Sequence, residues 1–302
     1  MNRWIDLLDP TQEELERAVP TELHGRALGQ MLTPAQHDDE PRPTLESHGT
    51  YAFGVFLVAV VVPEEDRVFY QEIDIALTHD VIVTVRKTPP GEQPFDTGPV
   101  HEACPDPEKL SPGFIAHRIV DEVAEAFLDL VDALDGEMDE LEDLVDAGQP
   151  AVLRRRVSDL RHDLLHVRRT LAPTRDAVRK VIDNRVELDG EELFTRDIEI
   201  HFADAYDKLL RAGDGLELAR DLASGVRDHL QAKIANDQNE VMKRLTVIAS
   251  LLLLPTFIVG LYGQNFQDLP EVTWVFGYWW SWGWIILTTI GQLAFYRWKR
   301  WI

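Results

Sequence analysis

The sequence LTVIASLLLLPTFIVGLY, residues 245–262, contains no charged side chain over 18 positions. A second uncharged stretch of 25 residues covers 272–296. A helix needs about 20 mainly apolar residues to cross the hydrocarbon core of a bilayer, which is roughly 30 Å thick. The two stretches therefore predict two membrane-spanning helices rather than the buried core helices of a soluble protein.

The residues that flank these stretches are typical of a membrane anchor. Seven of the eight tryptophans lie in the last 29 residues, and indole rings favour the membrane–water boundary. Basic residues precede the first stretch and follow the second, whereas the loop 263–271 has no Lys or Arg but carries Asp268 and Glu271. The positive-inside rule predicts cytoplasmic termini and an external loop. We expect no cleaved signal, because residues 1–10 contain no long apolar run.

Composition excludes several classes of function. The chain of 302 residues has a formal charge of −23, and its first 242 residues hold 51 acidic against 25 basic side chains. Such an acidic body argues against a nucleic-acid partner. The single cysteine, Cys104, excludes an intrachain disulfide and a Cys-rich zinc site. No phosphate-binding Gly-rich loop or nucleophile constellation supports an ATPase or hydrolase, so we do not expect an enzyme.

The acidic body divides into a mixed region and a helical region. Residues rich in Val, Phe and Tyr at 51–62, 68–70, 72–77 and 81–85 predict strands of a mixed sheet, after a short helix that begins near Thr11. Residues 111–183 predict two long helices. The first holds twelve acids and no base over 121–146, and the second holds nine Lys and Arg over 154–180.

These charges predict an antiparallel hairpin with a solvated face. An acidic face presented to divalent cations is the alternative. His162 and His166 are four residues apart, but without an evident third ligand we interpret them as surface positions.

Residues 196–254 contain no proline, so a single helix can run from the cytoplasm into the membrane. Gly213, Gly215 and Gly225 argue against strict continuity. The predicted fold is an α+β cytoplasmic domain with a long helical hairpin and a stalk helix, followed by two transmembrane helices. Its parts are the α/β domain 1–110, the hairpin 111–195, the stalk 196–244, the first span 245–262, the external loop 263–271, the second span 272–296 and the basic tail 297–302.

Short motifs surround the first span: NEVMK at 239–243, YGQNF at 262–266 and PE at 270–271. This combination resembles the CorA family of divalent-cation channels and transporters, which includes ZntB-type zinc transporters. The resemblance covers nearly the whole chain and is strongest over 200–302, and QEID at 71–74 also fits it. The family usually has Gly-Met-Asn where this chain has Gly263-Gln264-Asn265, which leaves the preferred ion open.

The motif at 263–265 can act as a selectivity filter. Because Mg²⁺ gives up its water reluctantly, a filter for it should offer neutral oxygens to the hydrated ion. Asn265 amide oxygens and Gly263 carbonyls would do this, Gln264 adds a second amide, and Asp268 and Glu271 would concentrate cations at the entrance.

One face of the long helix is a candidate pore wall. Its members recur at three- and four-residue steps: Asn239, Met242, Leu245, Ala249, Leu253, Thr256 and Gly260. The resemblance implies that this face lines the pore of a homopentamer, where the apolar members would gate by dewetting. A helix–helix packing stripe is the alternative, and periodicity does not separate the two.

The resemblance also implies regulation by cytoplasmic Mg²⁺ bound between subunits. The stalk segment FADAYD at 202–207 nominates Asp204, and the loop GEQPFD at 91–96 nominates Glu92, with Asp96 in reserve. Oxygen ligands from two subunits suit a hard cation.

The leading hypothesis is a homopentameric channel in a bacterial inner membrane that passes Mg²⁺ passively into the cell, with Co²⁺ and Ni²⁺ as further candidates. Its partners are copies of itself, the bilayer and divalent cations. A ZntB-type Zn²⁺ transporter, with or without proton coupling, is the second hypothesis. A non-conducting membrane-anchored sensor or scaffold is the third.

Overall fold

The computed structural model describes residues 3–19, 23–36, 40–62, 67–147, 150–264 and 270–302. The chain forms two compact units, Met1–Arg227 and Asp228–Ile302.

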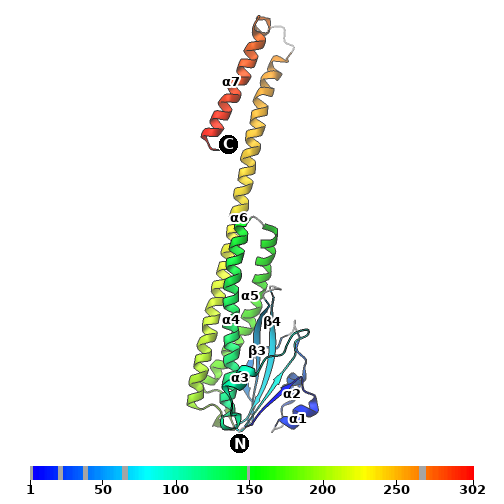
Figure 1. Ribbon diagram of the computed structural model, residues 1–302, viewed down its shortest axis with the longest axis vertical. Helices are drawn as coiled ribbons and strands as arrows, with labels where there is room; N and C mark the ends of the chain where they lie inside the picture. Colours follow the sequence, from blue (N-terminus) through cyan, green and yellow to red (C-terminus); the bar gives the residue numbers. More distant parts are fainter. Residues whose placement is uncertain (1–2, 20–22, 37–39, 63–66, 148–149, 265–269) are drawn as a thin grey trace. The chain divides into compact units, whose positions relative to one another are not determined.

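The first unit is built on a five-stranded mixed sheet with the order β1-β5-β4-β3-β2 (Figure 1). Its strands are β1 (Arg3–Leu8), β2 (Thr44–Ser47), β3 (Ala52–Val62), β4 (Arg67–Leu77) and β5 (Val81–Arg86). Strands β1 and β5 pair in parallel, and all other neighbours are antiparallel. The mixed sheet confirms the sequence prediction. Strand β4 joins the predicted strands 68–70 and 72–77, whereas β1 and β2 were not predicted.

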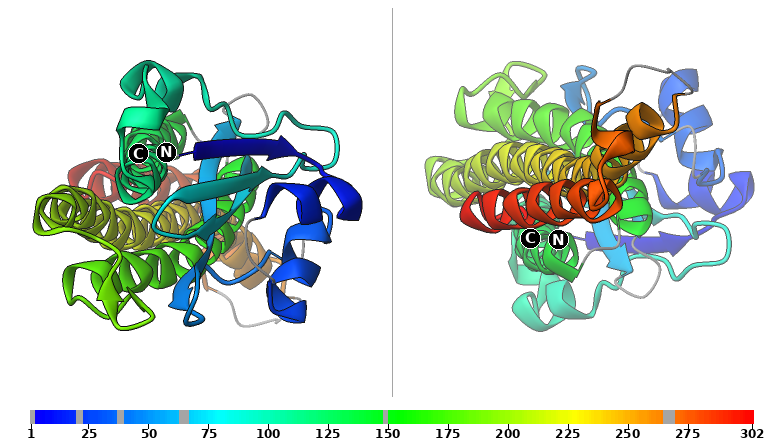
Figure 2. Two further views of the ribbon diagram at one scale, coloured as in Figure 1. Left: turned by 90° about the horizontal axis from the view of Figure 1, so that it is seen from below. Right: turned by 90° about the horizontal axis from the view of Figure 1, so that it is seen from above.

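Helices cover both faces of this sheet (Figure 2). Helices α1 (Gln12–Ala18) and α2 (Gly25–Leu32) pack on one face through Leu15 and Met31, which meet side chains of β3 and β5. Thr11 caps α1 and forms a capping box with Glu14, which agrees with the predicted start of a helix near Thr11. The long helices α4 (Pro112–Ala147) and α5 (Pro150–Ile182) lie on the other face.

The predicted apolar repeat of α4 is buried along its whole length. Its members are Ile119, Val123, Phe127, Val131, Leu134, Met138, Leu141 and Val145. Short elements link the sheet to this helix and the hairpin to the next one: α3 (Gly98–Ala103), the 3-10 helix η2 (Pro107–Lys109), β6 (Glu187–Leu188) and β7 (Glu191–Glu192).

Helix α6 (Arg196–Tyr262) is one continuous helix of 67 residues, so its three glycines do not break it. Gly215 has a packing role instead. A Cβ atom there would lie 2.4 Å from the Val131 Cγ1 atom of α4, so glycine permits the two helices to approach closely. The first part of α6 therefore belongs to the first unit as a third long helix.

The second unit contains the rest of α6, the 3-10 helix η3 (Pro270–Thr273) and α7 (Gly277–Trp298). Helix α7 begins five residues after the predicted start of the second apolar stretch. The main chain explains this start, because a Cβ atom on residue 277 would lie 2.0 Å from the Glu271 carbonyl oxygen. Only glycine allows η3 to fold back so closely on the first turn of α7.

A buried charge cluster fixes α2 to the sheet. Lys87 Nζ donates to the Gln30 carbonyl at 2.6 Å, pairs with Glu72 and lies 2.9 Å from Asp74 Oδ2. All three charged side chains are buried. One ammonium does not balance two carboxylates, and burial raises the pKa of Asp74 from its ordinary 3.8 to about 8. Asp74 is therefore largely protonated at neutral pH.

This cluster predicts how stability depends on pH. Because the folded state holds a proton on Asp74 that the unfolded state has released, the free energy of unfolding should fall as pH rises from about 4 to about 8. In Asp74→Asn this fall should be smaller, as measured by denaturation of the purified full chain at several pH values. Lys87→Met leaves the buried Glu72 carboxylate without its cation. This substitution should lower the free energy of unfolding by about 3–5 kcal/mol. Parallel pH profiles for wild type and Asp74→Asn would contradict this assignment.

Candidate functional site

The candidate pore residues of α6 share one property in the structure: all seven, from Asn239 to Gly260, are exposed. Exposure reaches 61% for Met242, 55% for Leu245 and 70% for Leu253. Large apolar side chains are rarely left open to water over a continuous surface. This face of α6 therefore lacks a cover within the described part of one chain.

Helix α7 covers the opposite face of α6. Val247 is buried there, and Ser250 receives two contacts: Gln292 Nε2 donates to its carbonyl at 3.2 Å, and the Tyr296 hydroxyl donates to its Oγ at 2.6 Å. At 100° per residue, Val247 lies about 120–180° around the helix from every member of the candidate face except Asn239, whereas Ser250 lies across the helix only from Leu245 and Thr256. The candidate face is thus part of the surface that α7 leaves uncovered, which also includes Ile248, Leu252 and Val259.

Helix α6 also contains the segment that suits a membrane. Among helices in the described ranges, α6 is the one whose length and composition permit a span, and 6% of that 18-residue segment is buried. A core helix of a soluble protein would be mostly buried. Helix α7 is rich in Trp, Tyr, Gly and Thr, which have low hydropathy, and does not meet the same criterion.

The polar members of the face can offer oxygen to a cation. The Thr256 hydroxyl donates its proton to the Leu252 carbonyl at 2.7 Å, so its free lone pairs can face a hydrated ion. At the end of α6, the amide of Gly263 donates to the Val259 carbonyl at 2.9 Å, and Gln264 is exposed. Asn265 and Asp268, predicted for the filter and the pore mouth, lie outside the described residues. Glu271 is half-buried in η3.

Asp204 lies on the third turn of α6 with an exposed side chain. One turn later, Lys208 Nζ lies 2.6 Å from both Asp121 Oδ1 and Glu125 Oε1 on α4. Burial alone would lower the pKa of Lys208, but hydrogen bonds to these carboxylates outweigh it and raise the pKa. This ion triad fixes the part of α6 that presents Asp204.

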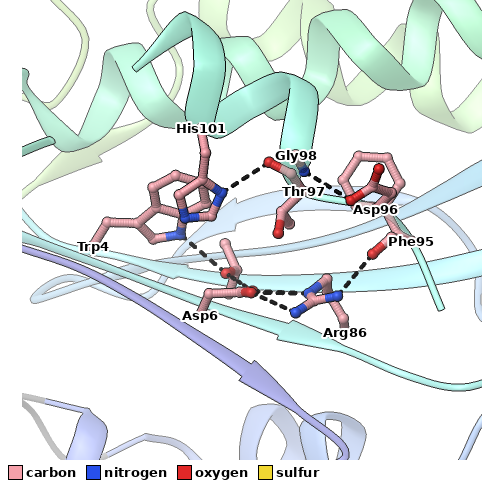
Figure 3. A network of polar contacts seen from close by, with 9 residues as sticks. Trp4, Asp6, Arg86, Phe95, Asp96, Thr97, Gly98 and His101 are labelled. Carbon is pink, nitrogen blue, oxygen red and sulfur yellow. Dashed lines mark hydrogen bonds and ion pairs between the residues drawn. The ribbon is translucent and has the colours of Figure 1, made fainter. Parts of the chain in front are cut away.

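Glu92 lies in the segment that follows β5, and it pairs with Arg67 at the start of β4. Arg86 holds this segment against the sheet: its side chain pairs with Asp6 at 2.7 Å and donates to the Phe95 carbonyl at 2.9 Å (Figure 3). The reserve candidate Asp96 is exposed, and its Oδ1 accepts a hydrogen bond from the Gly98 main-chain amide at 2.9 Å.

The other end of this network fixes α3. The Trp4 and His101 rings stack with centroids 4.1 Å apart, and His101 Nδ1 lies 2.8 Å from the Thr97 carbonyl (Figure 3). Trp4 Nε1 also donates to the Thr84 hydroxyl at 3.1 Å. The segment that carries Glu92 is therefore anchored at both ends.

One chain does not bring Glu92 and Asp204 together. Asp204 lies one turn before Lys208, which contacts Asp121 near the start of α4. Arg67, the ion-pair partner of Glu92, lines a cavity together with Gly136, which lies farther along α4. These levels on α4 are about 20 Å apart at 1.5 Å per residue. In the part of the chain that the structure describes, no group of three or more His, Cys, Asp or Glu is arranged to hold a metal. A shared metal would need a second chain.

The structure adds contacts that the sequence did not indicate. Arg67 and Arg86 hold Glu92 and its segment. The sequence pattern does not indicate these roles, because their partners are residues far along the chain or main-chain carbonyls. His166 is half-buried rather than fully exposed, and its Nε2 lies 3.2 Å from Glu40 Oε1. His162 is exposed as expected.

Comparison with known proteins identifies the same family as the sequence motifs, and the match extends over nearly the whole chain. Residues 2–300 match the family described as "CorA-like Mg2+ transporter protein". The putative metal ion transporter YfjQ of Bacillus subtilis is 30% identical over 306 residues, covering 99% of this chain and 89% of that protein. The cobalt/magnesium transport protein CorA of Methanocaldococcus jannaschii is 24% identical over 285 residues, covering 91% of this chain and 84% of that protein.

The fold comparison is consistent with this. A solved structure of the CorA magnesium transporter from M. jannaschii superposes with a TM-score of 0.78 at 21% identity, covering 99% of this chain and 91% of that chain.

The anchoring of the Glu92 segment yields a prediction. Arg86→Met removes the pair with Asp6 and the bond to the Phe95 carbonyl, so amides of residues 88–97 should exchange at least about tenfold faster in hydrogen-exchange mass spectrometry. Arg3→Met, on the exposed end of β1, is the matched control and should leave these amides unchanged. Unaltered exchange in Arg86→Met would show that the segment is held by other contacts.

Proposed function

We propose, from the premise that the chain belongs to the CorA-like family of Mg²⁺ transporters, that it forms a homopentamer whose α6 helices surround a path for Mg²⁺. As a member of this family, the chain is a divalent-cation transporter. The number of copies, the ion, the gating and the path are the proposal. The proposal is supported by the uncovered apolar surface of α6, which includes the candidate pore face and lies away from the buried Val247.

A ring of five copies gives each part of this face a role. Met242, Leu245 and Leu253 form apolar constrictions that close by excluding water, and Asn239 and Thr256 form polar rings between them. The small residues Ala249 and Gly260 leave the path wide. A cation that keeps its water shell needs such alternation of width and polarity, because stripping the shell of Mg²⁺ is costly.

The loop after α6 forms the outer mouth. Gly263, Gln264 and Asn265 offer carbonyl and amide oxygens to the hydrated ion, and Asp268 with Glu271 raises the local cation concentration. The basic residues before the span and after α7 orient both termini toward the cytoplasm of a bacterial inner membrane. Transport is then passive influx, down the gradient and the membrane potential.

Regulation is proposed to act through Asp204 of one subunit and Glu92 of its neighbour. A bound Mg²⁺ bridges the two carboxylates and favours the closed ring, so transport falls as cytoplasmic Mg²⁺ rises. Arg67 holds Glu92 in place when the metal is absent and competes with it for the carboxylate. The bridge must span two chains, because one chain keeps the two side chains at different levels of α4.

The filter is tested by flux. In liposomes, Asn265→Ala should lower Mg²⁺ influx by at least about tenfold, because each subunit loses its amide ligand. Asn239→Ala, at the other end of the face, should retain more flux than Asn265→Ala. Undiminished influx in Asn265→Ala would remove the filter from the proposal.

The same assay, run with Zn²⁺ and an imposed pH gradient, separates the other candidates. Gln264 in place of the usual methionine keeps a ZntB-type Zn²⁺ transporter as the second candidate. Faster, proton-driven Zn²⁺ uptake would favour it. No metal-dependent flux at all would favour a sensor or scaffold.

The regulatory site is tested by a shift in closure. Asp204→Asn should require several-fold more cytoplasmic Mg²⁺ to halve the flux, because one carboxylate ligand is lost. Asp207→Asn, a neighbouring carboxylate of the same helix, is the matched control and should close like wild type. A closure curve for Asp204→Asn that overlays the wild-type curve would withdraw the site.

A further inference from the structure

A groove of about 560 Å³ lies between α5 and α6 in the first unit. Leucines of both helices line its apolar part. Its charged lining is mainly positive, with the carboxylates of Asp214 and Glu217 against five guanidinium groups. These belong to Arg161, Arg168, Arg175, Arg220 and Arg227. We call this surface the basic groove.

Several of these arginines have no carboxylate partner in the part of the chain that the structure describes. Among the described residues, Arg161, Arg168 and Arg220 form no ion pair. Guanidinium groups favour planar, bidentate contact with carboxylates. The groove is therefore suited to a partner that presents carboxylates on a helical or extended surface.

The same unit carries such a surface on α4. Its exposed carboxylates, which we call the acidic face, are Asp132, Asp135, Asp139, Glu142 and Asp143. Four of these positions lie within about 100° of Val131, on the side of α4 away from the buried Leu134 and Leu141. Val131 is the residue that Gly215 of α6 meets, so the acidic face borders the seam between α4 and α6.

The basic groove and the acidic face lie on different flanks of α6. Lys208 and Gly215 meet α4, whereas Gly213 and Arg220 line the groove toward α5. At 100° per residue, these two sets are about 140° apart around the helix. A subunit whose acidic face on α4 and basic groove between α5 and α6 lie on different flanks of α6 cannot pair them with each other, but neighbours in a ring can.

The two surfaces also lie at the same level of the bundle. Arg156 of α5 pairs with Glu140 of α4 at 3.1 Å, so Arg161, five residues later on an antiparallel helix, is level with residue 135. Gly215 of α6 meets Val131, so Arg220, five residues later on a parallel helix, is level with residue 136. Both arginines thus lie level with the middle of the acidic face.

We infer that the acidic face of one subunit docks in the basic groove of the next copy of this chain. The inference rests on the homo-oligomer of the proposed function. A ring with its axis along α6 keeps every copy of a residue at one height, so its head-to-tail contact can join only surfaces of equal height. The basic groove and the acidic face meet that condition, and their charges are complementary. The partner copy therefore supplies carboxylates to Arg161 and Arg220.

Disulfide cross-linking between two tagged full-length copies tests this docking. One copy carries Arg161→Cys and the other Asp135→Cys, both with Cys104→Ala, and they are co-expressed and oxidised in membranes. A disulfide needs Cα atoms within about 7 Å, so a covalent dimer with both tags reports direct contact. We expect at least about fivefold more dimer than from the control pair Arg169→Cys and Asp135→Cys. Arg169 is an exposed residue of α5 that follows Arg168 in the sequence but does not line the groove.

Charge exchange provides a second readout in the same cells. Arg220→Glu, added to the copy that carries Arg161→Cys, should lower the dimer yield, and Asp139→Lys in the other copy should restore it. If the cross-link does not form, native mass spectrometry shows whether the protein is still an oligomer. An intact oligomer without the cross-link would overturn the docking and leave the proposed function standing. A monomer would overturn both.

Discussion

Helix α6 carries more apolar surface than its own chain can cover. Helix α7 packs against Val247 and Ser250, while Met242, Leu245 and Leu253 on the other side remain open. Exposing such surface to water is unfavourable in proportion to its area, so it has to meet lipid, another subunit or a path that excludes water when closed. The chain belongs to a family of Mg²⁺ transporters, and the proposed ion path along α6 would account for this uncovered surface.

The first unit contains two networks that fix the segments carrying the proposed cation ligands. The Arg86 network anchors the segment that presents Glu92, and the Lys208 triad anchors the turn of α6 that presents Asp204. Because the carboxylates lie at different levels of one chain, the proposed metal bridge between subunits would couple metal binding to subunit arrangement. The inferred contact between the acidic face of α4 and the basic groove of the next subunit would set that arrangement independently of the metal.

Local patterns in the sequence predicted much of this architecture. The repeat from Ile119 to Val145 is buried as expected, Thr11 caps its helix, and the proline-free run after residue 196 forms one helix. Each of these depends on neighbours within a few turns. Strand β1 was missed because its partner β5 lies about 78 residues away, as the pairing of Arg3 with Val81 shows. The start of α7 at Gly277 depends on a main-chain approach of η3 that apolar content does not reveal.

The accessibility of single cysteines along α6 tests the central claim most directly. With Cys104 replaced, cysteines at Met242, Leu245, Leu253 and Thr256 would be challenged by a water-soluble thiol reagent in open, membrane-embedded protein. Ile248 and Leu252 lie about 60° and 20° around the helix from Leu245, on the side away from Leu253. Reactivity that peaks on the first set and fades toward Ile248 is the result we predict. Equal reactivity on both sides, or protection of the first set in the open state, would mean that this face packs against protein and that the ions pass elsewhere.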